Sequence, residues 1–434
     1  MTLGYFLWMF LRSCMKYSCL VVLFALFPIL ISDRSLADQP KTDIPNAARV
    51  ILVKAGKLMN DKNYAGAIAL LVDFQAQAPS EKAGEKDQKG YFHAEVYQAI
   101  GTCYLFDNKF QQATNAFERA LQKDQNLLAA RLNLAKSFYE LHEYSKAAEC
   151  FAKGYEQAPD KNPEYLYFSA VSHLLAKQNE KSISVFDRLL AAHSSDFRPE
   201  WRENLVHALL AAGKHKRALP HIRNLTEVYS GAKQMQWQEI LLHQYLQLDM
   251  EKEALSLANR LIDQNPTEPK WWRAIVHIHL QQNRYQPALS GLLITGFLDS
   301  LSEQELQLAA DLYLQLGVPQ KAAPFYETIL NAKKSPRNLT NLVIALQQMD
   351  QAEQALVTLD KFSEEAMSPK IVMLKADLLY GLGNYTDAAQ LYHKTAESGE
   401  GKQKDRALQM AKYAKLQATY EQDGMSRRRA TATF

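Results

Sequence analysis

The chain has little of what several common classes of protein depend on. Its 434 residues include only 4 Cys, 17 Gly and 15 Pro. So few cysteines exclude a disulfide-rich framework, and so little Gly and Pro excludes collagen-like and low-complexity chains. The net charge is only +3, and the one basic cluster, Arg427 to Arg429, lies in the last residues and is expected to be a solvated tail. We therefore expect no nucleic-acid partner.

The sequence also lacks the short motifs that are typical of several enzyme classes. It contains no HExxH, no GxSxG, no Walker-type glycine loop and no paired CxxC. The two glycines of "YGLGNY" (residues 380–385) are explained by a helix end and a turn. We expect a protein that is not an enzyme, with no cofactor and no metal site.

The first 37 residues have the order of a secretory signal. Arg12 and Lys16 precede an apolar run, Leu20 to Ile31, and Ser35 and Ala37 supply the small residues of a cleavage site. The run is shorter than the ~20 residues of a spanning helix, although an uncleaved inner-membrane anchor remains the alternative. Both interpretations export the body of the protein, so we expect it in the periplasm, with membrane contact only through an uncleaved signal.

Cleavage after Ala37 would leave only two cysteines, Cys103 and Cys150. An exported protein that depends on disulfides usually carries more, at recognisable spacings. We expect these two as small buried side chains.

A pattern in residues 97–122 is repeated from residue 131. The offset is 34 residues, so that Tyr104 corresponds to Phe138 and Phe117 to Phe151. A small residue recurs at one position of the pattern along the whole chain, with serine in place of alanine in one copy. These small residues are Ala67, Ala113, Ala147, Ser182, Ala218, Ala254, Ala288, Ala322, Ala355 and Ala388.

The period and the order of aromatic and small residues resemble the tetratricopeptide-repeat family. The resemblance implies an all-α fold, a right-handed superhelical solenoid of about ten helix-turn-helix units over residues 38–400. Residues 401–422, rich in Lys and Gln, are expected to form a polar capping helix. Residues 423–434 are expected to be a disordered tail.

Glycine and proline fall where the repeat turns or ends. Gly213, Gly317 and Gly383 occupy the fifteenth position, in the turn between the two helices, where a left-handed backbone is expected. Three prolines fall at position 32, where the second helix must stop. They are Pro79, Pro159 and Pro266.

In this family the first helix of each pair lines a concave groove, mainly through positions 2, 5, 9, 12 and 13. In the early repeats these positions hold a basic and aromatic group, which fits an extended peptide but is equally explained by packing between neighbours. In three consecutive later repeats position 9 is histidine, by chance or as a pH-sensitive or carboxylate-binding stripe. The predicted groove residues are Phe106, Lys136, Tyr139, Tyr167, His207, His243 and His277.

One segment supports a narrower interpretation. Residues 270–330, with Trp271, Trp272, Gly296 and Phe297, are similar to exported tetratricopeptide proteins that accompany TonB–ExbB–ExbD systems. We expect a periplasmic scaffold that binds a protein or peptide partner in its groove, with TonB-system components as the specific candidates. The alternative is a structural component of an envelope assembly, held through its convex face or its ends.

Overall fold

The computed structural model describes residues 44–78, 87–333, 335–361 and 368–431. Within these ranges the chain forms 21 α-helices, α2 to α22, one short 3-10 helix and no strand. The predicted all-α class is therefore confirmed. The predicted signal peptide, residues 1–37, and Pro79 lie outside the described residues.

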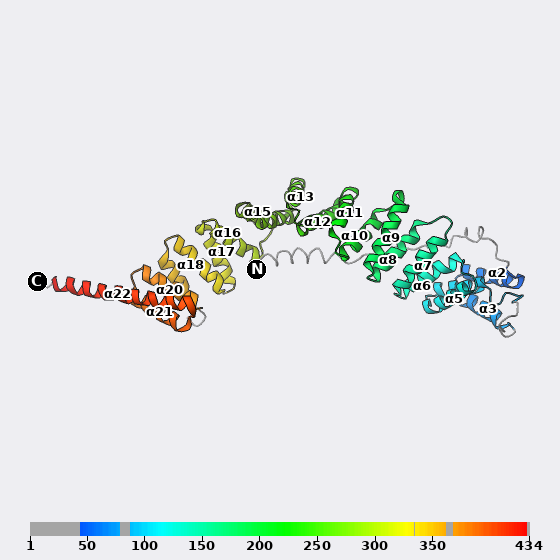
Figure 1. The fold of residues 1–434 in the computed structure, drawn as a ribbon, viewed down its shortest axis with the longest axis horizontal. Helices are drawn as coiled ribbons and strands as arrows, with labels where there is room; N and C mark the ends of the chain where they lie inside the picture. The colour runs from blue at the N-terminus through cyan, green and yellow to red at the C-terminus, as the bar shows by residue number, and fades with distance from the viewer. Residues whose placement is uncertain (1–43, 79–86, 334, 362–367, 432–434) are drawn as a thin grey trace. The chain divides into compact units, whose positions relative to one another are not determined.

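The chain divides after Leu248 into two compact units. In the N-terminal unit each helix packs against the helix before it and the helix after it, so successive pairs form a row (Figure 1). Its helices are α2 (Asn46–Asn60), α3 (Tyr64–Ala76), α4 (Ala94–Phe106), α5 (Phe110–Lys123), α6 (Leu128–Glu140), α7 (Tyr144–Gln157), α8 (Pro163–Leu175), α9 (Asn179–Ala192), η2 (Ser194–Asp196), α10 (Pro199–Ala211), α11 (His215–Val228) and α12 (Gly231–Gln247).

The C-terminal unit continues the same alternation of first and second helices. By the sequence register α12 and α13 are the two halves of the sixth repeat, and each is described within its own unit. The helices of this unit are α13 (Glu251–Gln264), α14 (Pro269–Gln281), α15 (Tyr285–Leu298), α16 (Glu303–Gln315), α17 (Pro319–Ala332), α18 (Pro336–Gln348), α19 (Ala352–Asp360), α20 (Pro369–Gly381), α21 (Tyr385–Ser398) and α22 (Gly401–Thr431).

The predicted register is confirmed at the small residue. All ten small residues, from Ala67 to Ala388, lie on the second helices and have no exposed surface. The serine at this position keeps its hydroxyl satisfied, because Ser182 Oγ donates to the carbonyl of Ala170 at 2.8 Å. A second close approach lies at Gly101, where an added Cβ would sit 2.7 Å from the ring of Phe117. Both positions let helices approach more closely than larger side chains allow.

The turn between the two helices is left-handed in every repeat. The three predicted glycines have φ of 71°, 72° and 81°. The other turns place an ordinary residue in the same conformation, with φ between 54° and 60°. These residues are Lys62, Asn108, His142, Lys177, Asp249, Asn283 and Asp350.

Proline marks the helix boundaries on both sides. Pro159 and Pro266 lie just past the ends of α7 and α13, as predicted. Five first helices also begin with proline, where the missing N–H has no partner in any helix and φ is already suitable. These are α8, α10, α14, α18 and α20.

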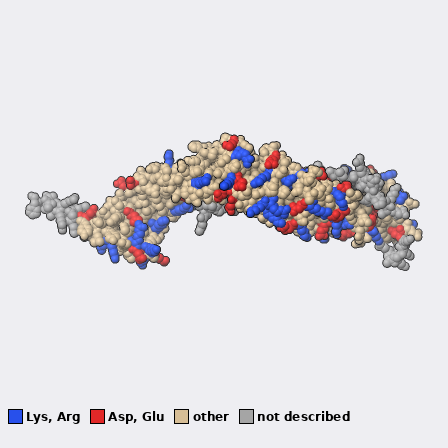
Figure 2. Space-filling view, turned by 45° about the horizontal axis from the view of Figure 1, so that its top comes forward, with Lys and Arg blue, Asp and Glu red and all other residues tan. Residues whose placement is uncertain are grey.

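Ion pairs connect consecutive repeats of the N-terminal unit. Arg198 pairs with Glu164 at 2.6 Å, Arg217 with Asp187 at 2.8 Å, and Arg188 with Glu156. Each pair spans about one repeat in sequence, and Figure 2 shows basic and acidic side chains intermixed along this unit. Because the partners are about half exposed, each pair contributes at most about 1 kcal/mol.

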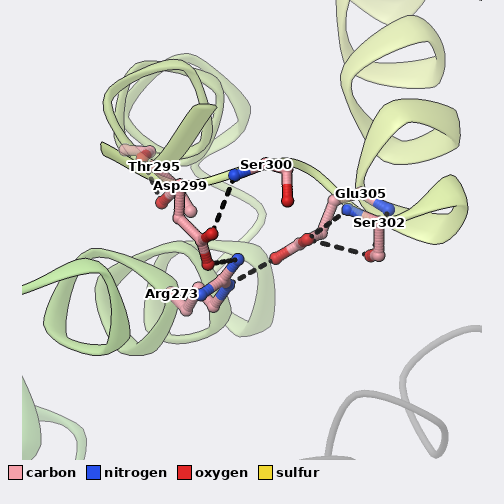
Figure 3. A network of polar contacts seen from close by, with 7 residues as sticks. Arg273, Thr295, Asp299, Ser300, Ser302 and Glu305 are labelled. Atoms are coloured by element: carbon pink, nitrogen blue, oxygen red, sulfur yellow. Dashed lines mark hydrogen bonds and ion pairs between the residues drawn. The ribbon is translucent and has the colours of Figure 1, made fainter. Parts of the chain in front are cut away.

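A partly buried polar network holds the junction of α14, α15 and α16 (Figure 3). Arg273 of α14 donates to Glu305 at 2.7 Å and pairs with Asp299, just after α15, at 3.0 Å. Glu305 also accepts from the backbone N–H and the hydroxyl of Ser302, each at 2.8 Å, which completes a capping box at the start of α16. One buried carboxylate therefore fixes the direction in which the chain enters α16.

The last helix differs from the prediction in its length. α22 begins at Gly401, as expected for the cap, but continues to Thr431, through most of the residues predicted as a disordered tail. Ala407, Ala411 and Ala414 are buried, and the last two pack in one core with α20 and α21.

Candidate partner-binding surface

The predicted groove residues of the N-terminal unit lie on successive first helices. Lys136 and Tyr139 are on α6, Tyr167 on α8, His207 on α10 and His243 on α12, and all five are half-buried. Contacts described below connect α8 to α10 and α10 to α12. The name "groove row" is used here for Lys136, Tyr139, Tyr167, His207 and His243.

Tyr139 packs on its own repeat. Its ring meets Tyr144 edge to face at 5.2 Å, with the planes at 68°. Tyr380 and Tyr385 occupy the same two positions in the tenth repeat and meet at 5.2 Å and 67°. Because the same pair recurs in a distant repeat, we assign this contact to holding the turn between the two helices. Burial raises the pKa of Tyr139, with further contributions from Tyr144, Glu140 and Tyr167.

Tyr167 connects two repeats. Its ring stacks on Trp201 of α10 with centroids 5.1 Å apart and planes at 17°. Its hydroxyl accepts a hydrogen bond from Asn204 Nδ2 at 3.2 Å. Burial raises the pKa of Tyr167 to about 12, so the phenol stays neutral and its O–H is available to donate. Tyr167 therefore combines a packed ring with a polar tip.

Lys136 is the charged member of the groove row. It lies one helical turn before Tyr139 on the same face of α6. Its side chain is half-buried and has no hydrogen-bond or ion-pair partner among the described residues. An ammonium held there without a carboxylate favours an incoming carboxylate or carbonyl oxygen.

The two histidines of the row both contact neighbouring side chains. The His207 ring lies 6.3 Å from the Trp237 ring of α12, and burial lowers its pKa although Glu203 opposes the shift. His243 Nδ1 lies 3.3 Å from Nε2 of Gln244. A lowered pKa keeps His207 uncharged at neutral pH, which weighs against a permanently cationic, carboxylate-binding stripe.

His277 belongs to the C-terminal unit, on α14. It is half-buried, burial lowers its pKa, and its Nε2 is buried without a hydrogen-bond partner among the described residues. His207 and His243 are thus described in one unit and His277 in the other.

Phe106 takes part in a different contact. At the end of α4 it is 40% exposed and stacks on Tyr64 at 5.5 Å. Tyr64 begins α3, so the pair bridges the first and second repeats.

Three further observations bear on chemistry. Cys103 is buried and Cys150 half-buried, both are free thiols, and burial raises the pKa of each to about 11. In the described part of the chain no three His, Cys, Asp or Glu side chains are grouped as a metal site would require. Over the same residues, no helix is both long and apolar enough to cross a membrane.

The predicted site residues did not include three buried tryptophans of the first helices. Trp201, Trp237 and Trp271 occupy the third repeat position in three consecutive repeats and are at most 3% exposed. Their recurrence at one repeat position was a signal that could have identified them. The family pattern places its aromatic one position later, so the register search passed over them.

Comparison with known proteins agrees with the repeat structure. Residues 105–171 match the family model described as tetratricopeptide repeat. No curated protein sequence matches the chain. None of the structural similarities that follow bears on what the chain binds.

Three solved structures resemble the chain at low identity. A chain of the structure of Naa15/Naa10 bound to HypK-THB is 15% identical with a TM-score of 0.42; the match covers 80% of this chain but 58% of that one. Yeast Tom70 is 11% identical with a TM-score of 0.31, covering 88% and 98%. A tetratricopeptide repeat protein from Parabacteroides merdae is 13% identical with a TM-score of 0.32, covering 69% and 99%.

Proposed function

We propose that the chain is a non-enzymatic scaffold that binds a protein or peptide partner along the groove row. The match of residues 105–171 to the tetratricopeptide-repeat model and the alternation of first and second helices support this proposal. The observation that carries the proposal is the half-buried ammonium of Lys136, which no described carboxylate pairs. On the next first helix, Tyr167 offers a neutral hydroxyl on a ring stacked on Trp201. A peptide carbonyl or carboxylate on Lys136, with apolar contact on Tyr167, is the simplest occupant.

The test compares two lysines of the same unit. Lys136→Glu should weaken partner capture by about tenfold or more, because a central charged anchor is worth about 2 kcal/mol. Lys181→Glu, on the exposed side of α9, is the matched control and should leave capture unchanged. Crosslinked pull-down from intact cells followed by quantitative blotting measures both. Equal capture by the two variants would remove the groove row from the proposal.

The same measurement distinguishes the groove scaffold from the alternative function. A structural component of an envelope assembly, held through its convex face or ends, predicts that Lys136→Glu and Lys181→Glu retain their partners equally. Tyr139→Ala tests stability, because the Tyr139 ring packs on Tyr144. We expect this variant to lower the melting temperature of the protein. Partner capture by this variant and by the wild type is therefore compared below the melting temperature of the variant.

We further propose that the scaffold is exported, which rests on the signal-like residues 1–37. The mature N-terminus should then be at or near Asp38, and cell fractionation with N-terminal sequencing measures this. A full-length cytoplasmic protein would contradict the proposal. Within the periplasm, the resemblance of residues 270–330 makes ExbB, ExbD and TonB the first partners to test in the crosslinked pull-down.

A further inference from the structure

The C-terminal helix carries an exposed apolar stripe that a polar cap does not need. Tyr413, Leu416 and Tyr420 are 50%, 55% and 71% exposed. Their spacing of three and four residues places them on one face of α22. Ala411 and Ala414, which pack against the preceding helices, lie on the other side. The name "cap stripe" is used for Tyr413, Leu416 and Tyr420.

A repeated polar contact shows what place α22 occupies. In the eighth repeat Asp311 accepts from Tyr326 at 2.7 Å and from Arg337, at the start of the next first helix, at 2.8 Å. In the tenth repeat Asp377 accepts from Tyr392 at 2.6 Å and from Arg406 of α22 at 3.4 Å. Arg406 thus corresponds to Arg337, and α22 lies where the first helix of a further repeat would lie.

This correspondence places the cap stripe on the groove side. Counting from Arg406 as position 2, Tyr413 falls at position 9 and Leu416 at position 12. Those are two of the positions through which first helices line the groove in this family. Beyond Ala414, moreover, none of the residues 415–422 is buried, and α22 extends past α21 in Figure 1. The stripe is therefore open to a partner along its whole length.

The stretch of helix that carries the stripe has charges of one sign, and Glu421 follows directly after it. From Arg406 to Tyr420 the helix contains no Asp or Glu. Lys412 and Lys415 are exposed in this stretch, while Arg406 is engaged by Asp377. An apolar stripe with unpaired lysines beside it is complementary to an apolar segment flanked by carboxylates.

We propose that the cap stripe binds an acidic amphipathic helix of a protein partner. The partner's apolar residues, spaced three to four apart, pack along Tyr413, Leu416 and Tyr420, and its carboxylates face Lys412 and Lys415. This contact is separate from the groove row and adds a second attachment point, so it does not depend on Lys136.

A membrane surface fits the same stripe less well. One acyl chain alone gives only marginal, reversible membrane binding. Two tyrosines and one leucine present less apolar surface than such a chain, and both tyrosines carry a hydroxyl. A protein helix, which adds shape complementarity to the same charges, is therefore the occupant that we infer.

The experiment uses the full mature chain and a defined probe. The probe is a fluorescein-labelled peptide of about 20 residues, long enough to form a helix, with Leu at positions i, i+3 and i+7 and Glu beside them. A scrambled peptide of the same composition is the control. Fluorescence anisotropy should give tighter binding for the amphipathic order, and Leu416→Ala with Tyr420→Ala should weaken it about tenfold.

Three variants sharpen the interpretation. Lys412→Glu with Lys415→Glu should also weaken binding, and more so at low salt. Val357→Ala, which changes an exposed apolar residue of α19, should leave binding unchanged. Equal binding of the scrambled peptide, or unchanged binding by the stripe variant, overturns the proposal. So does tighter binding to vesicles of anionic phospholipid than to the peptide, lost in the same stripe variant.

Discussion

At the scale of single residues, the turn of each repeat imposes one unfavourable backbone conformation. Seven of the ten left-handed turn positions hold a residue with a side chain. Asn and Asp, which tolerate this region best, fill four of them. Lys62 and Lys177 do not have that tolerance, so these two turns retain strain of about 1 kcal/mol each.

Lys177 offers a direct test of this strain. Lys177→Gly should stabilise the protein by about 0.5 kcal/mol, because relief of the left-handed strain exceeds the added freedom of the unfolded chain. Lys181→Gly, inside α9, should instead destabilise it by about 1 kcal/mol. Thermal unfolding of the two variants gives the answer. A decrease in stability for Lys177→Gly would contradict the explanation.

The small residue of the repeat offers a substitution that should destabilise the protein. Ala288 has no exposed surface and lies where two helices approach closely. Ala288→Leu should therefore cost roughly 1–3 kcal/mol by overpacking. Lys402→Leu, on the exposed surface of α22, is the control and should cost much less. Urea unfolding midpoints distinguish them, and equal midpoints would mean that the register is wrong.

At the scale of helices, the network of Figure 3 shows that one carboxylate, that of Glu305, connects α14 to the start of α16. The Glu305 side chain is 4% exposed and accepts from Arg273 and Ser302. Glu305→Ala leaves the partly buried N–H of Ser302 and the guanidinium of Arg273 without their acceptor, so we expect a loss of roughly 1–3 kcal/mol.

Asp299 is the matched control for this loss. Its side chain is 48% exposed, although it meets the same arginine. Asp299→Ala should cost no more than about 1 kcal/mol. Chemical unfolding monitored by circular dichroism measures both variants. If the two cost the same, burial is not what makes Glu305 important.

Much of the helix order could be predicted, because short-range features of the repeat determine it. Small residues, turn glycines and boundary prolines each act within a few residues, so Ala254, Gly213 and Pro159 were placed correctly. The partners of the groove row could not be predicted in the same way. The stacking of Tyr167 on Trp201 depends on how neighbouring repeats pack against each other. No pattern of a few consecutive residues determines that packing.

The end of α22 was misjudged for a related reason. Its Lys and Gln content fits a solvated helix, and no proline interrupts the stretch from Gly401 to Thr431. The cap stripe was hidden by the same composition, since three apolar residues among many polar ones resemble ordinary surface residues. Only the correspondence between Arg406 and Arg337 revealed which face they occupy.

At the scale of the whole molecule, buried histidines connect stability to pH. Burial lowers the pKa of His173, His207, His221, His277 and His279 from an ordinary value of 6.5. The folded chain then binds fewer protons than the unfolded chain as the pH falls through 6.5. The neutral histidines therefore do not reduce the free energy of unfolding above that pH, and the free energy of unfolding decreases as the pH falls below it.

This decrease can be assigned to one residue at a time. The melting temperature should fall between pH 7.5 and pH 5.5, and His221→Gln should make the fall smaller. At His221 the cause includes Arg202, whose guanidinium donates to Nδ1 at 3.0 Å and repels a protonated ring; Arg217 adds to the repulsion and Asp187 opposes it. His393→Gln, at an exposed position of α21, is the control. An unchanged slope in His221→Gln would exclude His221 as a contributor.

The ion pairs and helix contacts between successive repeats have a kinetic consequence. In the described residues nearly every tertiary contact joins a helix to the next one or the one after, so the chain segment that must close to form it is about one repeat long. Short loops lose little entropy on closing, and such topologies fold quickly. Folding can start at several repeats at once and spread to neighbours. A ribosome-bound chain would thus acquire its structure repeat by repeat, well before synthesis ends.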